Sequence, residues 1–172
     1  QDRAPARSRE DTAQYLGIIQ RECDRLSRMI DGVIDFSKME RQVKRYHFEL
    51  HDLGEIVARS VEAFRPHADA DGFSLQLSIE ESLPMVKLDS DAIAQVLFNL
   101  LTNATQYSQE EKDIRVRVRR EGPAVAVDVV DRGIGIAPRD IDKVFDRFYS
   151  TWRRMDSPRQ GGLGLGLALS RE

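Results

Sequence analysis

The sequence has one cysteine, no long apolar run and no excess of basic residues. Because Cys23 stands alone, no disulfide can form within one chain, and a reducing compartment suits it. No apolar stretch reaches the length of a membrane span or of a signal-peptide core. The formal net charge of −3 favours neither a nucleic acid nor an anionic membrane as a partner. We therefore expect a cytoplasmic chain that binds no nucleic acid. If a parent protein is anchored in the inner membrane, its anchor lies outside these residues.

The first forty residues carry a helical pattern. Residues 1–10 hold Arg, Ser and Pro without apolar periodicity, which predicts a loop or a disordered terminus. Over residues 11–40 the apolar side chains recur in steps of three and four, namely Leu16, Ile19, Cys23, Leu26, Ile30 and Val33. This spacing draws one narrow stripe along a helix. It indicates either a surface helix packed on its own domain or a bundle helix that pairs with a second chain.

Residues 43–172 alternate between helical and strand patterns. Loose alternation over 43–50 predicts an edge strand. Asp52 followed by Glu55 predicts a capping box at the start of a helix, and Pro66 and Gly72 are expected to end that helix.

Strict alternation of apolar and polar residues predicts a strand at 73–79, and the short run after Pro84 predicts another at 85–88. Apolar residues at every second position predict two more strands, at 114–118 and 125–129. Asp89 or Ser90 is expected to cap a helix between the second and third of them. The last two form a hairpin, whose alternating arginines belong to a solvated face. The mixture predicts an α+β fold, a two-layer α/β sandwich with helices on one face of the sheet.

Four short motifs follow one another along the chain. They are Asn99-Leu100-Leu101-Thr102-Asn103-Ala104-Thr105-Gln106-Tyr107-Ser108, Asp131-Arg132-Gly133-Ile134-Gly135, Phe145-Asp146-Arg147-Phe148-Tyr149, and Gly161-Gly162-Leu163-Gly164-Leu165-Gly166-Leu167. In this order the first, second and fourth motifs resemble the N, G1 and G2 boxes of the ATP-binding (Bergerat) domain shared by sensor histidine kinases, gyrase, MutL and the heat-shock chaperones, and the third lies where histidine kinases carry their F box. The third motif points to the sensor histidine kinases, and the resemblance runs from about Asp11 to the end.

The asparagine pair suits a magnesium nucleotide. Asn99 and Asn103 are four residues apart and share one helix face. Amide oxygens suit a Mg²⁺ ion that is bound mainly to phosphates, although one Asn alone could instead bond to neighbouring backbone. The resemblance implies that Asn103 is the Mg²⁺ ligand and that Asn99 supports it. Hydrolytic relatives carry a glutamate base at the position of Asn99, and an amide cannot take a proton at neutral pH.

The resemblance assigns the adenine end of the site to the first two motifs. Asp131 is expected to accept the adenine amino hydrogen. Gly133 and Gly135 would allow positive φ and close approach of the backbone, and Ile136 is also expected in the site. Tyr107 lies where the family places an aromatic ring near adenine, or it is an ordinary core tyrosine.

The phosphate end is assigned to the later motifs. Arg147 is expected to reach the phosphates or to be a surface arginine, Phe145 and Phe148 are expected to pack as core, and Phe148 is included in the ATP site. Residues 150–160 form a candidate lid. The backbone N–H groups at the start of the next helix are expected to meet the phosphates, at Gly162, Leu163, Gly164, Leu165 and Gly166.

The resemblance implies an ATP-dependent protein histidine kinase. Residues 11–42 resemble the second helix of the dimerisation domain and its hinge, which implies a homodimer through residues 11–40. Residues 43–172 then form the catalytic domain, C-terminally truncated because the family adds closing strands beyond Glu172. The γ-phosphoryl group of Mg-ATP would pass to a histidine on the dimerisation domain and then to an aspartate of a response regulator receiver domain.

The acceptor histidine of the family lies upstream of Gln1. None of His47, His51 and His67 carries the acceptor motif, so this chain alone is not expected to autophosphorylate. An alternative is a nucleotide-binding pseudokinase that acts as a conformational regulator; Gln106, where lysine is common, favours it mildly. A serine kinase is disfavoured by the stripe helix, and a hydrolytic ATPase by Asn99.

Overall fold

A computed structural model describes residues 15, 16, 19, 23, 46–108, 110–149 and 166–171. The chain divides into two compact units, Gln1–Val43 and Lys44–Glu172. In the first unit, Tyr15, Leu16, Ile19 and Cys23 are helical and exposed. The rest of the expected stripe helix lies outside the described residues. Within the described part of the chain, no helix has the length and apolar character needed to cross a membrane.

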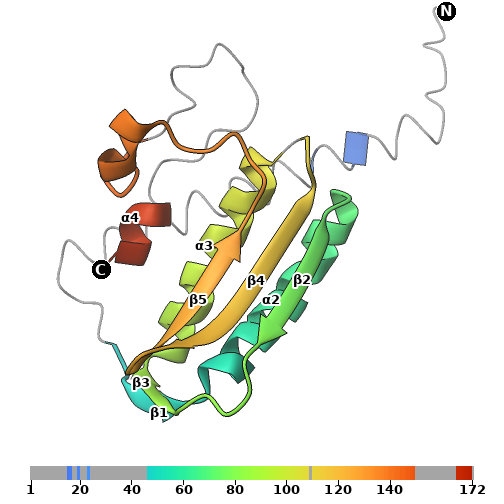
Figure 1. Ribbon diagram of the computed structural model, residues 1–172. Coiled ribbons are helices and arrows are strands. Elements are labelled where there is room, and N and C mark those ends of the chain that lie inside the picture. Colours follow the sequence, from blue (N-terminus) through green and yellow to red (C-terminus); the bar gives the residue numbers. More distant parts are fainter. Residues whose placement is uncertain are drawn as a thin grey trace, which may run out of the picture. The chain divides into compact units, whose positions relative to one another are not determined.

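The second unit contains a mixed three-stranded sheet. Strands β2 (Ser74–Ile79), β4 (Asp113–Glu121) and β5 (Ala124–Val130) lie in the order β2-β4-β5 (Figure 1). β2 runs parallel to β4, and β4 runs antiparallel to β5 as the predicted hairpin. A separate two-stranded antiparallel sheet joins β1 (Glu49–His51) to β3 (Val86–Leu88).

Two long helices begin at the predicted caps. Helix α2 (Leu53–Ala70) starts after Asp52, whose Oδ1 accepts the Glu55 N–H at 3.2 Å. Helix α3 (Ser90–Tyr107) starts after Asp89, whose Oδ1 accepts the Ala92 N–H at 2.9 Å. Each cap satisfies an amide that lacks a partner within the helix.

The predicted end of α2 at Pro66 is wrong, because the helix continues through Pro66 to Ala70. Proline removes one helical N–H and crowds the preceding turn. The last turn is nevertheless held, since Ala68 is fully buried and its carbonyl accepts the Phe73 N–H at 2.8 Å. Gly72, with φ of +75°, then turns the chain towards β2.

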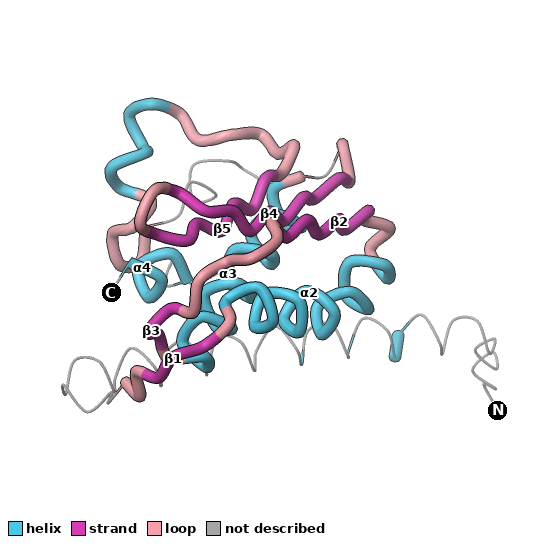
Figure 2. Tube along the Cα trace, turned by 60° about the horizontal axis from the view of Figure 1, so that its bottom comes forward, coloured by secondary structure: helices cyan, strands magenta, loops and turns pink. Residues whose placement is uncertain are grey.

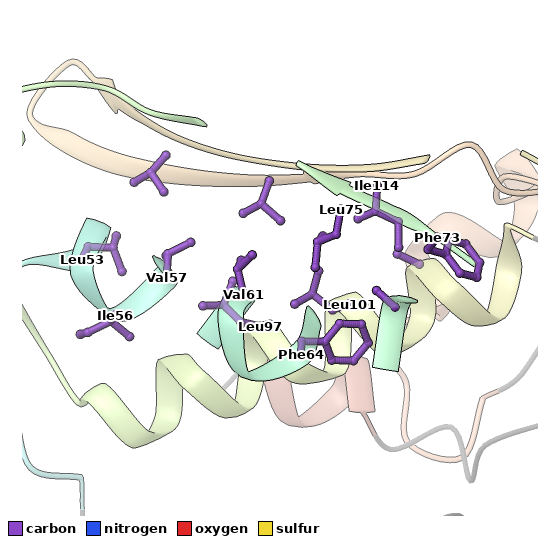
Figure 3. Packing of buried hydrophobic residues seen from close by; sticks show 14 of the residues in the cluster. Leu53, Ile56, Val57, Val61, Phe64, Phe73, Leu75, Leu97, Leu101 and Ile114 are labelled. Carbon is purple, nitrogen blue, oxygen red and sulfur yellow. The ribbon is translucent and has the colours of Figure 1, made fainter. Parts of the chain in front are cut away.

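The core lies between α2 and α3 on one side and the three-stranded sheet on the other (Figure 2). It is formed by residues that recur at helical spacing on the helices and at alternate positions on the strands, shown in Figure 3: Leu53, Ile56, Val57, Val61, Phe64, Leu97, Leu101, Phe73, Leu75 and Ile114. Arg119 lies on the opposite sheet face and pairs with Asp128 and Glu121. The predicted two-layer α+β sandwich is confirmed.

The segment after β5 packs differently from the prediction. It forms a 3₁₀ helix, η1 (Pro138–Lys143), followed by turns up to Tyr149. Phe145 and Phe148 were expected in the core, but they are 39% and 48% exposed. Short 3₁₀ turns that run outside the sheet present no continuous apolar face to the core. Helix α4 (Gly166–Arg171) ends the described chain.

Candidate functional site

Asp131 is fixed where β5 gives way to the glycine loop. One of its carboxylate oxygens, Oδ1, accepts the Gly133 N–H at 2.8 Å and the Ser108 hydroxyl at 3.3 Å. No donor among the described residues reaches Oδ2. Asp131 itself is exposed, so the carboxylate is oriented by one oxygen and has the other available for a ligand.

The loop after Asp131 lies against the end of α3. The Ile134 N–H donates to the Tyr107 carbonyl at 3.2 Å. A Cβ on Gly133 would lie 2.7 Å from that carbonyl oxygen and 2.8 Å from Asp131 Oδ1. Only glycine therefore fits at position 133. The sequence predicted a positive φ and close approach of the backbone to the base at Gly133. The structure instead shows no positive φ there, and the close neighbours of Gly133 are Tyr107 and Asp131 of the same chain.

The other residues predicted at the adenine end follow this loop. Gly135 has φ of +69°, the left-handed conformation expected of it. Ile136 is 50% exposed. Tyr107 is the last residue of α3 and is half-buried. The structure thus brings Tyr107, Asp131 and Gly133 into one hydrogen-bonded corner, and Gly135 and Ile136 follow it along the loop.

Asn99 and Asn103 lie one turn apart on α3, both half-buried. Asn99 Nδ2 donates to the Gly166 carbonyl at 3.3 Å, and this bond joins α3 to the start of α4. No hydrogen bond joins the Asn103 side chain to another described residue, so its amide oxygen is available to a ligand. The described residues contain no group of three or more His, Cys, Asp or Glu able to hold a metal ion.

The structure describes the third motif, and of the fourth motif it describes only Gly166 and Leu167. Arg147 and Phe148 lie on the exposed turns after η1, and Phe148 has φ of +62°, which is unusual for a residue with a side chain. The Arg171 guanidinium lies 5.7 Å from the centre of the Phe145 ring, so these turns contact α4. Gly162 to Leu165 and the candidate lid 150–160 lie outside the described residues, and Gly166 begins α4.

Sequence reasoning missed two residues at this site. Ser108 ends α3 and is fully buried, and its hydroxyl orients Asp131. Its place directly after Tyr107 in the first motif was a usable signal, since a buried hydroxyl needs a partner. Asp140 is 5% exposed and accepts a hydrogen bond from the Tyr149 hydroxyl at 2.6 Å. Tyr149 ends the third motif, but nothing in the sequence pattern marks Asp140 as its partner.

A cleft of about 230 Å³ lies along the N-terminal half of α3. Its lining is mainly apolar and includes Tyr46, Phe48, Ile93 and Val96, with Asn99 as the only predicted site residue. Asp89 stands at its edge, where the backbone N–H groups of Ala92 and His47 hold the pKa of its carboxyl below the usual value. The cleft adjoins the asparagine pair but is separate from the Asp131 corner.

Comparison with known proteins identifies relatives of one kind. Residues 88–172 match the family described as histidine kinase-, DNA gyrase B-, and HSP90-like ATPases. The chain is 33% identical over 168 residues to the alginate biosynthesis sensor protein KinB of Pseudomonas aeruginosa, covering 98% of this chain and 27% of that protein. The chain spans about a quarter of the length of the curated relatives it matches first.

Two solved structures share the fold. Full-length ShkA in complex with AMPPNP superposes with a TM-score of 0.72 at 21% identity, over 95% of this chain and 34% of that one. Histidine kinase ThkA in complex with the response regulator protein TrrA superposes with a TM-score of 0.65 at 22% identity, over 85% and 42% of the two chains. At these identities the similarity establishes the fold alone.

Proposed function

Because the chain belongs to the sensor histidine kinases, with an ATP-binding domain of the histidine kinase-, gyrase B- and HSP90-like type, we propose that its second unit binds Mg-ATP and donates the γ-phosphoryl group to a histidine. The observation that carries this proposal is the Asp131 corner. Its carboxylate is oriented through Oδ1 by Ser108 and Gly133, while Oδ2 has no donor among the described residues. ShkA, a protein of the same fold, was solved with the ATP analogue AMPPNP.

The chemistry of this corner selects adenine. A carboxylate oxygen only accepts hydrogen bonds. The 6-amino group of adenine donates to it, whereas guanine presents a carbonyl oxygen at the same position. Since Oδ1 is already engaged by Ser108 and Gly133, the base would bind at Oδ2. The nucleotide is therefore ATP rather than GTP.

The asparagine pair fits a magnesium ion that is held largely by phosphates. Asn103 offers an amide oxygen, and Asn99 is oriented by its bond to Gly166. One or two protein ligands with several phosphate and water oxygens suit the octahedral preference of Mg²⁺. When bound, the ion would neutralise charge on the transferring phosphoryl group.

The same pair favours transfer over hydrolysis. Activation of water needs a base that accepts a proton, and the amide of Asn99 is not one. In addition, its nitrogen is committed to the Gly166 carbonyl. Bound ATP should therefore persist until an acceptor histidine is presented in line with the γ-phosphoryl group.

The first unit is proposed to supply the dimer contact. Leu16 and Ile19 are helical and are 61% and 58% exposed, which leaves apolar surface at these two positions for a second chain. The proposed dimer contact runs through residues 11–40. A Leu16→Glu variant should shift the chain towards monomer in sedimentation equilibrium. The response regulator is the proposed final acceptor, supported by the ThkA–TrrA complex of the same fold. A cytoplasmic location follows from the proposal, because ATP and receiver domains are found there.

Phosphoryl transfer can be tested in trans. The chain is mixed with ATP labelled at the γ-phosphate and with a separately prepared, histidine-bearing dimerisation domain of a sensor histidine kinase. We expect label on that domain that is stable to base and labile to acid, as for phosphohistidine, and none with an Asp131→Asn variant. A chain that binds ATP but transfers no label would instead support the regulatory pseudokinase.

A further inference from the structure

Asp140 is the only buried charged side chain among the described residues, at 5% exposure. A buried carboxylate is unfavourable unless donors satisfy it. The Tyr149 hydroxyl donates to its Oδ1 at 2.6 Å, which is the short distance expected of a charge-assisted bond. Arg139 adds little, because its Nε lies 3.9 Å away and its side chain is 78% exposed. Tyr149 is therefore a strong partner of Asp140.

This bond closes a compact series of turns. Within it, the Val144 N–H donates to the Asp140 carbonyl at 3.0 Å, and the Tyr149 N–H donates to the Asp146 carbonyl at 3.2 Å. Phe148, which directly precedes Tyr149, has φ of +62°. A residue with a side chain keeps this conformation only where its surroundings hold it. The Asp140–Tyr149 hydrogen bond contributes to that restraint, because it fixes the side chain of the residue that follows Phe148.

The same turns are connected to the asparagine pair. The Phe145 ring faces the Arg171 guanidinium of α4 at 5.7 Å. At the other end of α4, the Gly166 carbonyl accepts Asn99 Nδ2 at 3.3 Å and the Ser170 hydroxyl at 2.9 Å. A short helix thus bridges the turns closed by Asp140 and the helix face proposed to meet Mg²⁺ and the phosphates.

We infer that Asp140 is a positioning residue of the nucleotide site, which through Tyr149 fixes the turns that hold α4 and Asn99 in register at the phosphate end. The inference rests on the proposed function. It concerns one end of the nucleotide only, because the Asp131 corner is tied to α3 by its own bonds. The triphosphate should therefore depend on Asp140, and the adenine base should not.

The test is a calorimetric titration of the whole chain with AMPPNP and Mg²⁺, and separately with adenosine. Tyr149→Phe removes only the hydroxyl and keeps the ring, so the fold is retained. We expect its Kd for AMPPNP to rise by about tenfold, the scale of one charge-assisted hydrogen bond. Asp140→Asn keeps an acceptor but loses the charge, so its Kd should rise by a smaller factor. Adenosine should bind both variants as it binds the parent.

Asp142→Asn is the matched control. Asp142 lies on the same 3₁₀ helix and is exposed, so this variant changes the net charge equally without touching the bond, and its affinities should equal those of the parent. In the double variant Asp140→Asn with Tyr149→Phe, the loss of AMPPNP affinity should be smaller than the two single losses combined, because the two residues share one hydrogen bond.

Two results would overturn the inference while leaving the proposed function intact. One is parent-like AMPPNP affinity in both single variants. The other is an equal loss for AMPPNP and adenosine, which would indicate a general structural role for Asp140. If the parent chain itself binds no AMPPNP, the proposed function fails and this inference fails with it.

Discussion

Replacing Gly133 by alanine places a methyl group against the end of helix α3. The new Cβ would lie 2.7 Å from the Tyr107 carbonyl oxygen and 2.8 Å from Asp131 Oδ1, whereas ordinary contact begins near 3.4 Å. Neither neighbour can yield cheaply, since one is backbone and the other is held by Ser108. The loop must therefore move away from α3 by roughly the shortfall in distance.

The cost can be worked from the bonds that this movement breaks. The Ile134 N–H to Tyr107 carbonyl bond is already 3.2 Å long, and the Gly133 N–H to Asp131 bond is 2.8 Å. Each hydrogen bond contributes about 1 kcal/mol net, so the free energy of unfolding should fall by about 2 kcal/mol. Asp131 loses one of its two orienting donors, and the affinity for ATP should fall by about tenfold.

The assay pairs urea denaturation with calorimetric titration of an ATP analogue. Gly122→Ala is the control, because Gly122 lies in the β4–β5 turn with φ of +59° and has open space around it. That variant should lose about 1 kcal/mol of stability from backbone strain and no nucleotide affinity. Parent-like nucleotide affinity in folded Gly133→Ala, or an equal affinity loss in Gly122→Ala, would refute the reasoning.

Three further variants test other parts of the account. Asp131→Asn should greatly weaken adenine nucleotide binding in calorimetry, because the amide nitrogen can repel the base amino group; unchanged affinity would reject the base contact. Asn103→Ala should remove most of the enhancement of ATP binding by Mg²⁺, and an unaltered Mg²⁺ response would reject that ligand. Asp89→Ala should cost about 1 kcal/mol of stability at pH 7 through loss of the α3 cap. The pKa of Asp89 is lowered by backbone N–H groups in the folded chain, so its contribution is present at neutral pH and is lost as the pH falls below about 4. Parent and variant should then converge in acid denaturation, and a constant difference would contradict the cap assignment.

Local signals in the sequence predicted much of the fold. The caps at Asp52 and Asp89 and the alternation in the strands all depend on neighbours within a few residues, and the structure confirms them. Pro66 misled the prediction because tertiary burial of Ala68 outweighs the local cost of a proline in a helix. The order of strands and the parallel pairing of β2 with β4 depend on contacts far apart in the chain, which no local pattern encodes.

In the candidate site, too, local motifs could be read from the sequence, whereas contacts between residues far apart in the chain could not. Tyr107, Asp131 and Gly133, which the motifs assign to the nucleotide, meet where α3 ends and the loop after β5 begins. Their role in nucleotide binding stays a prediction. The partner of Asp131, buried Ser108, depends on where the helix ends in space. The exposure of Phe145 was missed because large apolar side chains usually lie in a core, whereas this one meets a guanidinium.

The second unit is proposed to bind an adenine nucleotide together with Mg²⁺. The most direct test of this proposal is a calorimetric titration of this chain with AMPPNP, with and without Mg²⁺, against the corresponding GTP analogue. We expect binding that is selective for adenine and strengthened by Mg²⁺. A folded chain that binds neither analogue, or that binds both equally and without regard to Mg²⁺, would contradict it.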